Sequence, residues 1–222
     1  MHQSTNHRRS REIFGQNFFG FEEWAEFYGI PFTKEQFRSR ATLPWIEREL
    51  TAPCPFTHCK RVSETHFAFL GLGCISGDPL TILKLHELHP APGKPCFFTY
   101  QRPAYPPTEF ENRATCEFQW YLMPLAAVPG TTGKRYRDQV ALLPSGYEVP
   151  RAVTEVMKVV LFYKKNGVYL DHAVSARCRD ARFDGRPVHV GVGEGGISIG
   201  GWWENKPPRF DIGLAAERKL LR

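Results

Sequence analysis

The chain has 222 residues, of which 42% are apolar and 14% aromatic, and this is enough for the core of one large domain. Its 19 glycines and 18 prolines predict many turns and exclude a simple helical bundle. The net charge of +6 fits a nucleic acid or an acidic partner but requires neither. No apolar run reaches the roughly 20 residues that span a bilayer, and no apolar segment follows the N-terminal charges as in a secretory signal. We therefore expect a cytoplasmic protein by default, with association with a virion as the alternative.

The N-terminal segment is polar and positively charged. Residues 1–13 contain three arginines, and we expect them to form a flexible basic tail. Residues 14–222 then form a single α+β domain. An aromatic-rich stretch over residues 14–28 is expected to pack on that domain, with the adjacent carboxylates of Glu22 and Glu23 in solvent.

Two local patterns predict the first elements of the domain. Residues 33–36, Thr-Lys-Glu-Gln, have the form of a capping box, which predicts a short helix that ends before Pro44. Residues 65–72 have the composition of a strand, with Phe67 and Phe69 buried.

The middle of the chain mixes regular elements with proline-rich connections. Residues 80–88 have helical spacing, and Asp-Pro at 78–79 supplies a helix start. Six prolines over residues 90–107 predict a long surface excursion, in which Phe97, Phe98 and Tyr100 form a short strand. Residues 116–122, with Phe118 and Trp120, alternate as a strand.

The strongest helix signal begins at Pro150. Apolar residues over 153–161 recur at intervals of three and four, which is the spacing of one helix face. Lys164, Lys165 and Gly167 match a helix C-terminus, because cations favour its negative end and glycine adopts the left-handed cap. The pattern predicts a helix that packs on the core.

The C-terminal third is rich in strand patterns separated by glycine turns. Asp184-Gly185 predicts a hairpin between residues 173–182 and 187–192. Further strands are predicted around residues 197–199 and 212–214, where apolar residues alternate again.

Six cysteines occur, and without a secretory signal their simplest interpretation is free thiols. Cys54 and Cys59 bracket His58, which makes these three residues weak candidates for a zinc site. Structural zinc sites generally use two such pairs, and only one is present here. We expect no cofactor.

Motifs that would indicate catalysis are missing from the sequence. The glycine-rich residues 191–196 resemble a phosphate-binding loop, but a strand pattern follows them where that loop needs a helix. No nucleophile elbow, zinc-protease helix or kinase motif is present. We therefore expect a binding protein rather than an enzyme.

One turn-rich stretch between two predicted strands concentrates the residue types of recognition surfaces. Tryptophan and arginine supply large contact areas, and loops held by a rigid scaffold often carry recognition. The candidate ligand-binding residues are Trp202, Trp203, Glu204, Asn205, Lys206, Arg209, Phe210 and Asp211.

The order of these patterns resembles C-type-lectin-like domains of the formylglycine-generating-enzyme branch. The resemblance rests on residues 67–72 and 77–81 as first strand and helix, on residues 146–152 entering the long helix, and on Trp202-Trp203 before the terminal residues 212–214. The same patterns also resemble those of the variable proteins that diversity-generating retroelements target. The resemblance implies two helices around a small twisted antiparallel sheet with long loops. The last cysteine is Cys178, so the catalytic cysteines of formylglycine-generating enzymes have no counterpart near the end of this chain.

The predicted function is the binding of a protein or small ligand by the C-terminal aromatic and polar face. The resemblance implies a retroelement-diversified variable protein or a phage-type adhesin of bacterial or phage origin. A basic nucleic-acid-binding protein that uses the N-terminal arginines is the first alternative. A metal-dependent enzyme of unknown reaction is the second.

Overall fold

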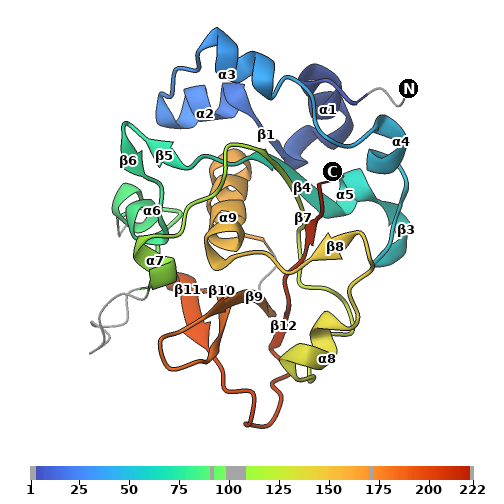
Figure 1. Cartoon of the computed structure of the whole chain (residues 1–222), viewed down its shortest axis with the longest axis vertical. Helices are drawn as coiled ribbons and strands as arrows, with labels where there is room; N and C mark the ends of the chain where they lie inside the picture. The colour runs from blue at the N-terminus through green and yellow to red at the C-terminus, as the bar shows by residue number, and fades with distance from the viewer. Residues whose placement is uncertain (1–3, 91–92, 99–108, 171–172, 221–222) are drawn as a thin grey trace.

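The computed structural model describes residues 4–90, 93–98, 109–170 and 173–220. In these residues a long helix, α9 (Ala152–Asn166), packs against strands of two separate sheets (Figure 1). The predicted mixed α+β class is confirmed, and helices and small sheets share one core. None of the described helices is both long and apolar enough to cross a membrane.

The first sheet has three strands in the order β1 (Phe18–Phe19), β4 (His66–Leu70), β7 (Trp120–Pro124). β1 runs parallel to β4, and β7 runs antiparallel to it. Every residue of these three strands is buried, so both faces of the sheet are covered. The predicted strand near residues 65–72 is confirmed as β4. The strand predicted at residues 116–122 lies instead at 120–124, because a strand buried on both faces need not alternate.

The second sheet has the order β11 (Gly196–Gly201), β10 (Pro187–Gly193), β9 (Ser175–Ala181), β12 (Ile212–Leu214). The hairpin predicted at Asp184-Gly185 joins β9 to β10, and Gly185 has a φ of 82°. A second antiparallel hairpin joins β10 to β11. β12 adds to β9 in parallel. All four predicted C-terminal strands are thus confirmed.

Helix α9 has the boundaries that the sequence predicts. Arg151 is its N-cap, directly after Pro150, and Gly167 caps its C-terminus in the left-handed conformation with a φ of 71°. Lys164 and Lys165 lie in its last turn. The first ten residues of the helix are buried on every side, which makes α9 the centre of the core rather than a surface helix with one buried face.

Short elements surround these layers. The other helices of the described residues are α1 (His7–Phe14), α2 (Phe21–Tyr28), α3 (Lys34–Ser39), α4 (Glu47–Leu50), α5 (Val62–Thr65), α6 (Ile82–Leu88), α7 (Glu109–Asn112) and α8 (Tyr136–Val140), together with the 3-10 turn η1 (Gly15–Asn17). The two-stranded pairs are β2 (Pro53–Cys54) with β3 (Thr57–Arg61), β5 (Cys74–Ile75) with β6 (Asp78–Pro79), and β8 (Tyr147–Glu148) with β13 (Glu217–Arg218).

The two predicted short helices have different outcomes. The capping box at Thr33 and Gln36 is formed and begins α3. The start predicted at residues 78–79 is wrong, because these residues pair with β5 as the strand β6. Thr81 caps α6 instead, and its hydroxyl accepts a hydrogen bond from the Lys84 amide.

Only part of the strand predicted from Phe97, Phe98 and Tyr100 lies within the described residues. Phe97 forms a parallel bridge with Ile197, and the Phe98 amide donates to the Ile197 carbonyl at 2.8 Å. Tyr100 and most of the proline-rich excursion lie outside the described residues.

The N-terminal residues correct the prediction of a flexible tail over residues 1–13. Residues 7–14 form α1, in which the side chain of Asn6 caps the first turn and His7, Ser10 and Phe14 are buried. Residues 1–3 lie outside the described part of the chain. The positive charges misled the prediction because they serve ion pairs within the fold: Arg11 reaches both Glu22 and Glu23 on α2.

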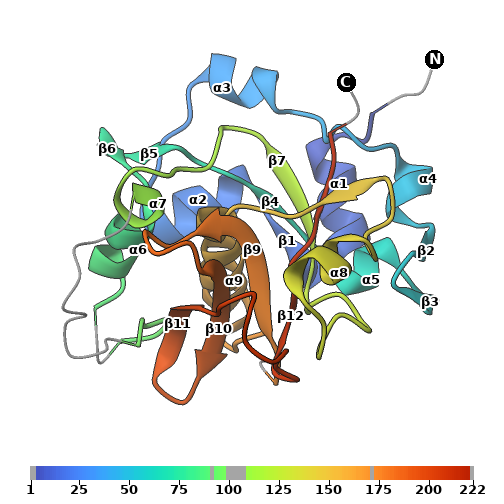
Figure 2. The same cartoon turned by 60° about the horizontal axis from the view of Figure 1, so that its bottom comes forward.

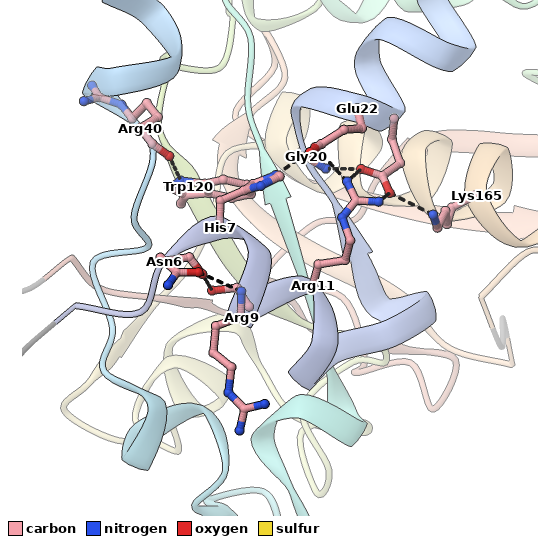
Figure 3. A network of polar contacts seen from close by, with 11 residues as sticks. Asn6, His7, Arg9, Arg11, Gly20, Glu22, Arg40, Trp120 and Lys165 are labelled. Carbon is pink, nitrogen blue, oxygen red and sulfur yellow. Dashed lines mark hydrogen bonds and ion pairs between the residues drawn. The ribbon is translucent and has the colours of Figure 1, made fainter.

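The carboxylate of Glu23 is likewise not solvated. Its side chain is 1% exposed and accepts hydrogen bonds from Arg11, from Lys165 on α9 and from the amide of Gly20. Figure 3 labels these three donors, which lie close together. Burial alone would raise the pKa of this carboxyl, but the hydrogen bonds from Lys165 and Gly20 and the charge of Arg11 hold the pKa below its ordinary value. Only Glu22 keeps about half of its side chain in solvent.

The expected architecture of two helices around one antiparallel sheet does not describe the molecule fully. More than two helices are present, the main strands form two sheets, and the pairs β1–β4 and β9–β12 are parallel. The C-type-lectin-like assignment therefore stays a prediction beyond the confirmed mixed class.

Candidate functional site

The eight predicted ligand-binding residues all lie in the connection between β11 and β12, at the end of the molecule opposite α3 (Figures 1 and 2). Trp202 is half-buried, whereas Trp203 and Phe210 keep 41% and 83% of their surface exposed. The other five residues are also exposed: Glu204, Asn205, Lys206, Arg209 and Asp211. The prediction of an accessible loop held between two strands is confirmed.

Trp202 is locked within this loop. Its indole Nε1 donates to the carbonyl of Pro207 at 3.1 Å, and the Arg209 guanidinium lies 4.9 Å from the ring centroid. Arg209 in turn donates through Nε and Nη2 to the two oxygens of Asp211. This fork lowers the pKa of the Asp211 carboxyl and holds the guanidinium over the indole ring.

Trp203 is covered from a different element. The guanidinium of Arg186, at the start of the second strand of the β9–β10 hairpin, lies 5.7 Å from the Trp203 ring centroid. Asp184 in the hairpin turn accepts from Arg186 Nε at 2.7 Å, and this hydrogen bond lowers the pKa of the Asp184 carboxyl. Each tryptophan therefore carries an arginine that an aspartate orients.

The hairpin residues beside the loop were missed by sequence reasoning. Phe183 is 61% exposed at the same turn, and the register pairs Val188 with Gly201, which brings the turn next to Trp202 and Trp203. The signal was present in part, because Asp184-Gly185 predicts the turn. The length of β11 that brings its end to this turn was not predicted. We define the aromatic–arginine surface as Trp202, Trp203, Arg209, Phe210, Phe183 and Arg186.

Two contacts fix the loop to the region around α8. The backbone amide of Tyr136 donates to Glu204 Oε1 at 2.8 Å, and the amide of Gly133 donates to the carbonyl of Arg209 at 2.9 Å. Phe210 covers Gly133, since a Cβ at that glycine would lie 2.8 Å from the ring. Glu204 thus has a structural partner, whereas Phe210 is 83% exposed and Asn205 and Lys206 are also exposed.

Cations outnumber carboxylates around this surface. Arg182, Arg186, Lys206 and Arg209 belong to the hairpin and the loop together with Asp184, Glu204 and Asp211, and Lys134 and Arg135 are exposed beside Tyr136, whose amide binds Glu204. Two of the arginines are already paired with aspartates. A positive excess of this kind fits an acidic protein as well as a nucleic acid.

The weak metal candidates do not form a centre. Cys54 is buried, whereas His58 and Cys59 are exposed on β3, and among the described residues no three His, Cys, Asp or Glu side chains are placed to share a metal ion. Burial raises the pKa of the Cys54 thiol, but hydrogen bonds, chiefly those involving Thr57 and Thr65, bring it below its usual value.

The glycines at 191–196 are a strand and a turn, as predicted. Residues Gly191 to Gly193 belong to β10, and Gly196, with a φ of 105°, opens β11 after the turn. No helix follows them, so they cannot present a helix N-terminus to a phosphate.

Comparison of the chain with known proteins finds no match among family models, curated proteins or solved structures. The function is therefore argued from the geometry of the chain itself.

Proposed function

We propose that the protein is a binding module and that its aromatic–arginine surface contacts another protein. The observation that supports this proposal is an arrangement that occurs twice in the surface. An arginine lies over a tryptophan ring and is paired with an aspartate, at Trp202–Arg209–Asp211 and at Trp203–Arg186–Asp184.

The stacks combine the residue types and the rigidity that protein recognition favours. Tryptophan and arginine dominate the binding energy of measured interfaces. A long side chain that is ordered before binding loses less conformational entropy when the partner arrives. Phe210 adds an open apolar side chain beside the stacks. The surface is thus prepared for a partner with apolar and carboxylate groups.

A protein partner fits this surface better than a nucleic acid. Single-stranded nucleic acids need aromatic faces for base stacking within a positive groove. Here arginines already lie over Trp202 and Trp203, so one face of each ring is covered where a base would stack.

The biological setting that we propose for this module follows from the resemblance to retroelement-diversified binders and phage adhesins. A reverse-transcriptase gene beside a near-copy of the sequence encoding residues 202–211 supports that setting. Its absence argues for a binder of constant sequence.

The test compares partner capture by matched variants of the full chain. Phe210→Ala and Trp203→Ala remove exposed aromatic area from the surface, and Phe37→Ala removes a 44% exposed phenyl ring from α3 at the opposite end. A protein retained by the wild type and by Phe37→Ala, but lost with the two surface variants, is then purified and titrated by calorimetry. We expect each surface variant to weaken its affinity by about tenfold or more, as for a hot-spot residue.

Thermal unfolding separates loss of binding from loss of structure. Phe210→Ala should keep a midpoint close to that of the wild type, because little of this side chain is buried. A purified partner that binds all variants equally contradicts the proposal. Salt-sensitive binding of single-stranded oligonucleotides with no protein partner supports the nucleic-acid alternative instead.

A further inference from the structure

A second site lies away from the aromatic–arginine surface and shares no residue with it. A cleft of about 750 Å³ opens between β8, β13, the start of α9 and the residues that lead into β7. Its lining includes Glu148, Glu217, Arg151, Arg179 and Thr154. A volume of this size is ordinary for a small-molecule site.

Two glutamates face each other across the strand pair in this cleft. Glu217 on β13 is the direct antiparallel partner of Glu148 on β8. Like charges directly opposite in a sheet destabilise it. Glu148 is exposed at the mouth, whereas Glu217 keeps only 9% of its surface exposed. Ionisation of both residues therefore has a cost for folding, which a shared proton or a bound cation would offset.

The buried carboxylate also has an unused acceptor. Glu217 Oε2 is buried and has no hydrogen-bond partner among the described residues. Buried polar atoms without partners are rare, and each one destabilises the folded protein. An ionised carboxylate accepts hydrogen bonds only, so once Glu217 has lost its proton the missing partner is a donor.

The pKa of Glu217 agrees with this requirement. Burial, the charge of Glu148 together with a side-chain hydrogen bond to it, and the charge of Glu155 raise the pKa of Glu217 to about 8, and the Arg179 charge acts in the opposite direction. Burial is the main cause of the raised pKa of Cys116 and of Tyr121, and the Glu217 charge adds to it. Near neutral pH the glutamate pair therefore shares a proton, which an ammonium group would replace.

Cations stand in the same cleft. Arg179 is exposed on β9, and among the described residues no ion pair joins it to a carboxylate. Arg151 lies 3.8 Å from Asp180, a loose pairing, whereas Arg218 is held by Glu49 at 2.7 Å. Arginine forks suit carboxylate groups. Glu217, which has an unused acceptor atom, thus lines the same cleft as Arg179 and Arg151, whose guanidinium groups can bind an anion.

We propose that this cleft binds a free α-amino acid, with its ammonium group on the Glu148–Glu217 pair and its carboxylate on Arg179 and Arg151. The ammonium supplies three donors and a positive charge to the two glutamates. A metal ion fits less well, because no third His, Cys, Asp or Glu of the described residues completes a coordination shell here.

The test titrates the full chain with the twenty standard L-amino acids by calorimetry, together with their N-acetyl and amide forms. We expect at least one amino acid to bind, and to lose about tenfold or more of its affinity when either charged group is blocked. Glu217→Gln and Arg179→Gln should weaken binding to a similar degree, whereas Glu35→Gln, an exposed acid on α3, should not.

The stability of the variants without ligand distinguishes loss of binding from loss of folding. The pKa of Glu217 is raised from 4.5 to about 8, so its contribution favours the folded state at low pH and is lost as the pH rises through that range. Glu217→Gln should therefore match or exceed wild-type stability above pH 8. The proposal is overturned if no amino acid binds, if N-acetyl forms bind equally well, or if Glu217→Gln keeps full affinity.

Discussion

Glu23 holds three elements together from a single carboxylate. Arg11 from α1 and Lys165 from α9 both contact it, and it also caps the Gly20 amide at the start of α2. Replacement by an uncharged group leaves two cations beside a buried site without their counter-charge. Loss of one partner from a buried ion pair typically costs several kcal/mol.

Glu23→Gln should therefore lower the free energy of unfolding by about 3 kcal/mol at neutral pH. Because hydrogen bonds and charges lower the pKa of Glu23 from its ordinary 4.5, its stabilisation is present above that pH and fades as the pH falls below it. Denaturant unfolding at neutral and acid pH measures both effects. Glu22→Gln, which changes a half-exposed carboxylate, should cost at most about 1 kcal/mol; equal losses for both variants would contradict this account.

At the scale of elements, the turn at residues 129–133 supports the aromatic–arginine surface. Gly133 has a φ of 68° and lies under the Phe210 ring, whereas Gly130 has a φ of 73° with nothing within 4 Å of an added Cβ. The two glycines thus have the same backbone requirement but different neighbours.

Gly130→Ala and Gly133→Ala should each lose about 1–2 kcal/mol of stability from the left-handed backbone. Only Gly133→Ala should also weaken the capture of a protein partner, because its methyl group displaces Phe210. Unfolding curves and partner titrations separate the two effects. If Gly130→Ala weakens binding as strongly, then loop stability rather than the position of Phe210 controls recognition.

Elements whose conformation depends only on neighbouring residues were predictable from the sequence. The capping box at Thr33 and Gln36, the Asp184-Gly185 turn and the Gly167 cap are fixed by hydrogen bonds or backbone angles within a few residues. The start of α6 was predicted too early, because Asp78 and Pro79 found a strand partner in β5. A tertiary contact there overrode a reasonable helix signal.

At the scale of the whole molecule, α1 belongs to the core rather than to a tail. His7 and Phe14 are buried, and Arg11 supplies a counter-charge to Glu23. Arg8, by contrast, has a side chain that is 90% exposed. The N-terminal arginines therefore differ in role although they look alike in sequence.

Deletion of residues 1–12 should destabilise the entire protein by about 3 kcal/mol or more, because it exposes apolar surface and leaves Glu23 with less charge compensation. Thermal unfolding should show a midpoint lower by about 6–12 °C, given a shift of roughly 2–4 °C per kcal/mol for a chain of this size. Arg8→Ala should leave the midpoint unchanged. An unaltered midpoint in the deletion would restore the tail interpretation.

Local sequence patterns were sufficient to predict the mixed class, the long helix at residues 152–166, the C-terminal hairpins and the exposed loop at residues 202–211. Each of these follows from backbone preferences or from periodic apolar residues within a short window. The tertiary structure alone decided that Glu23 is buried, that Arg186 covers Trp203 and that Glu148 meets Glu217. These contacts join residues far apart in the chain, and they depend on packing that no local pattern records.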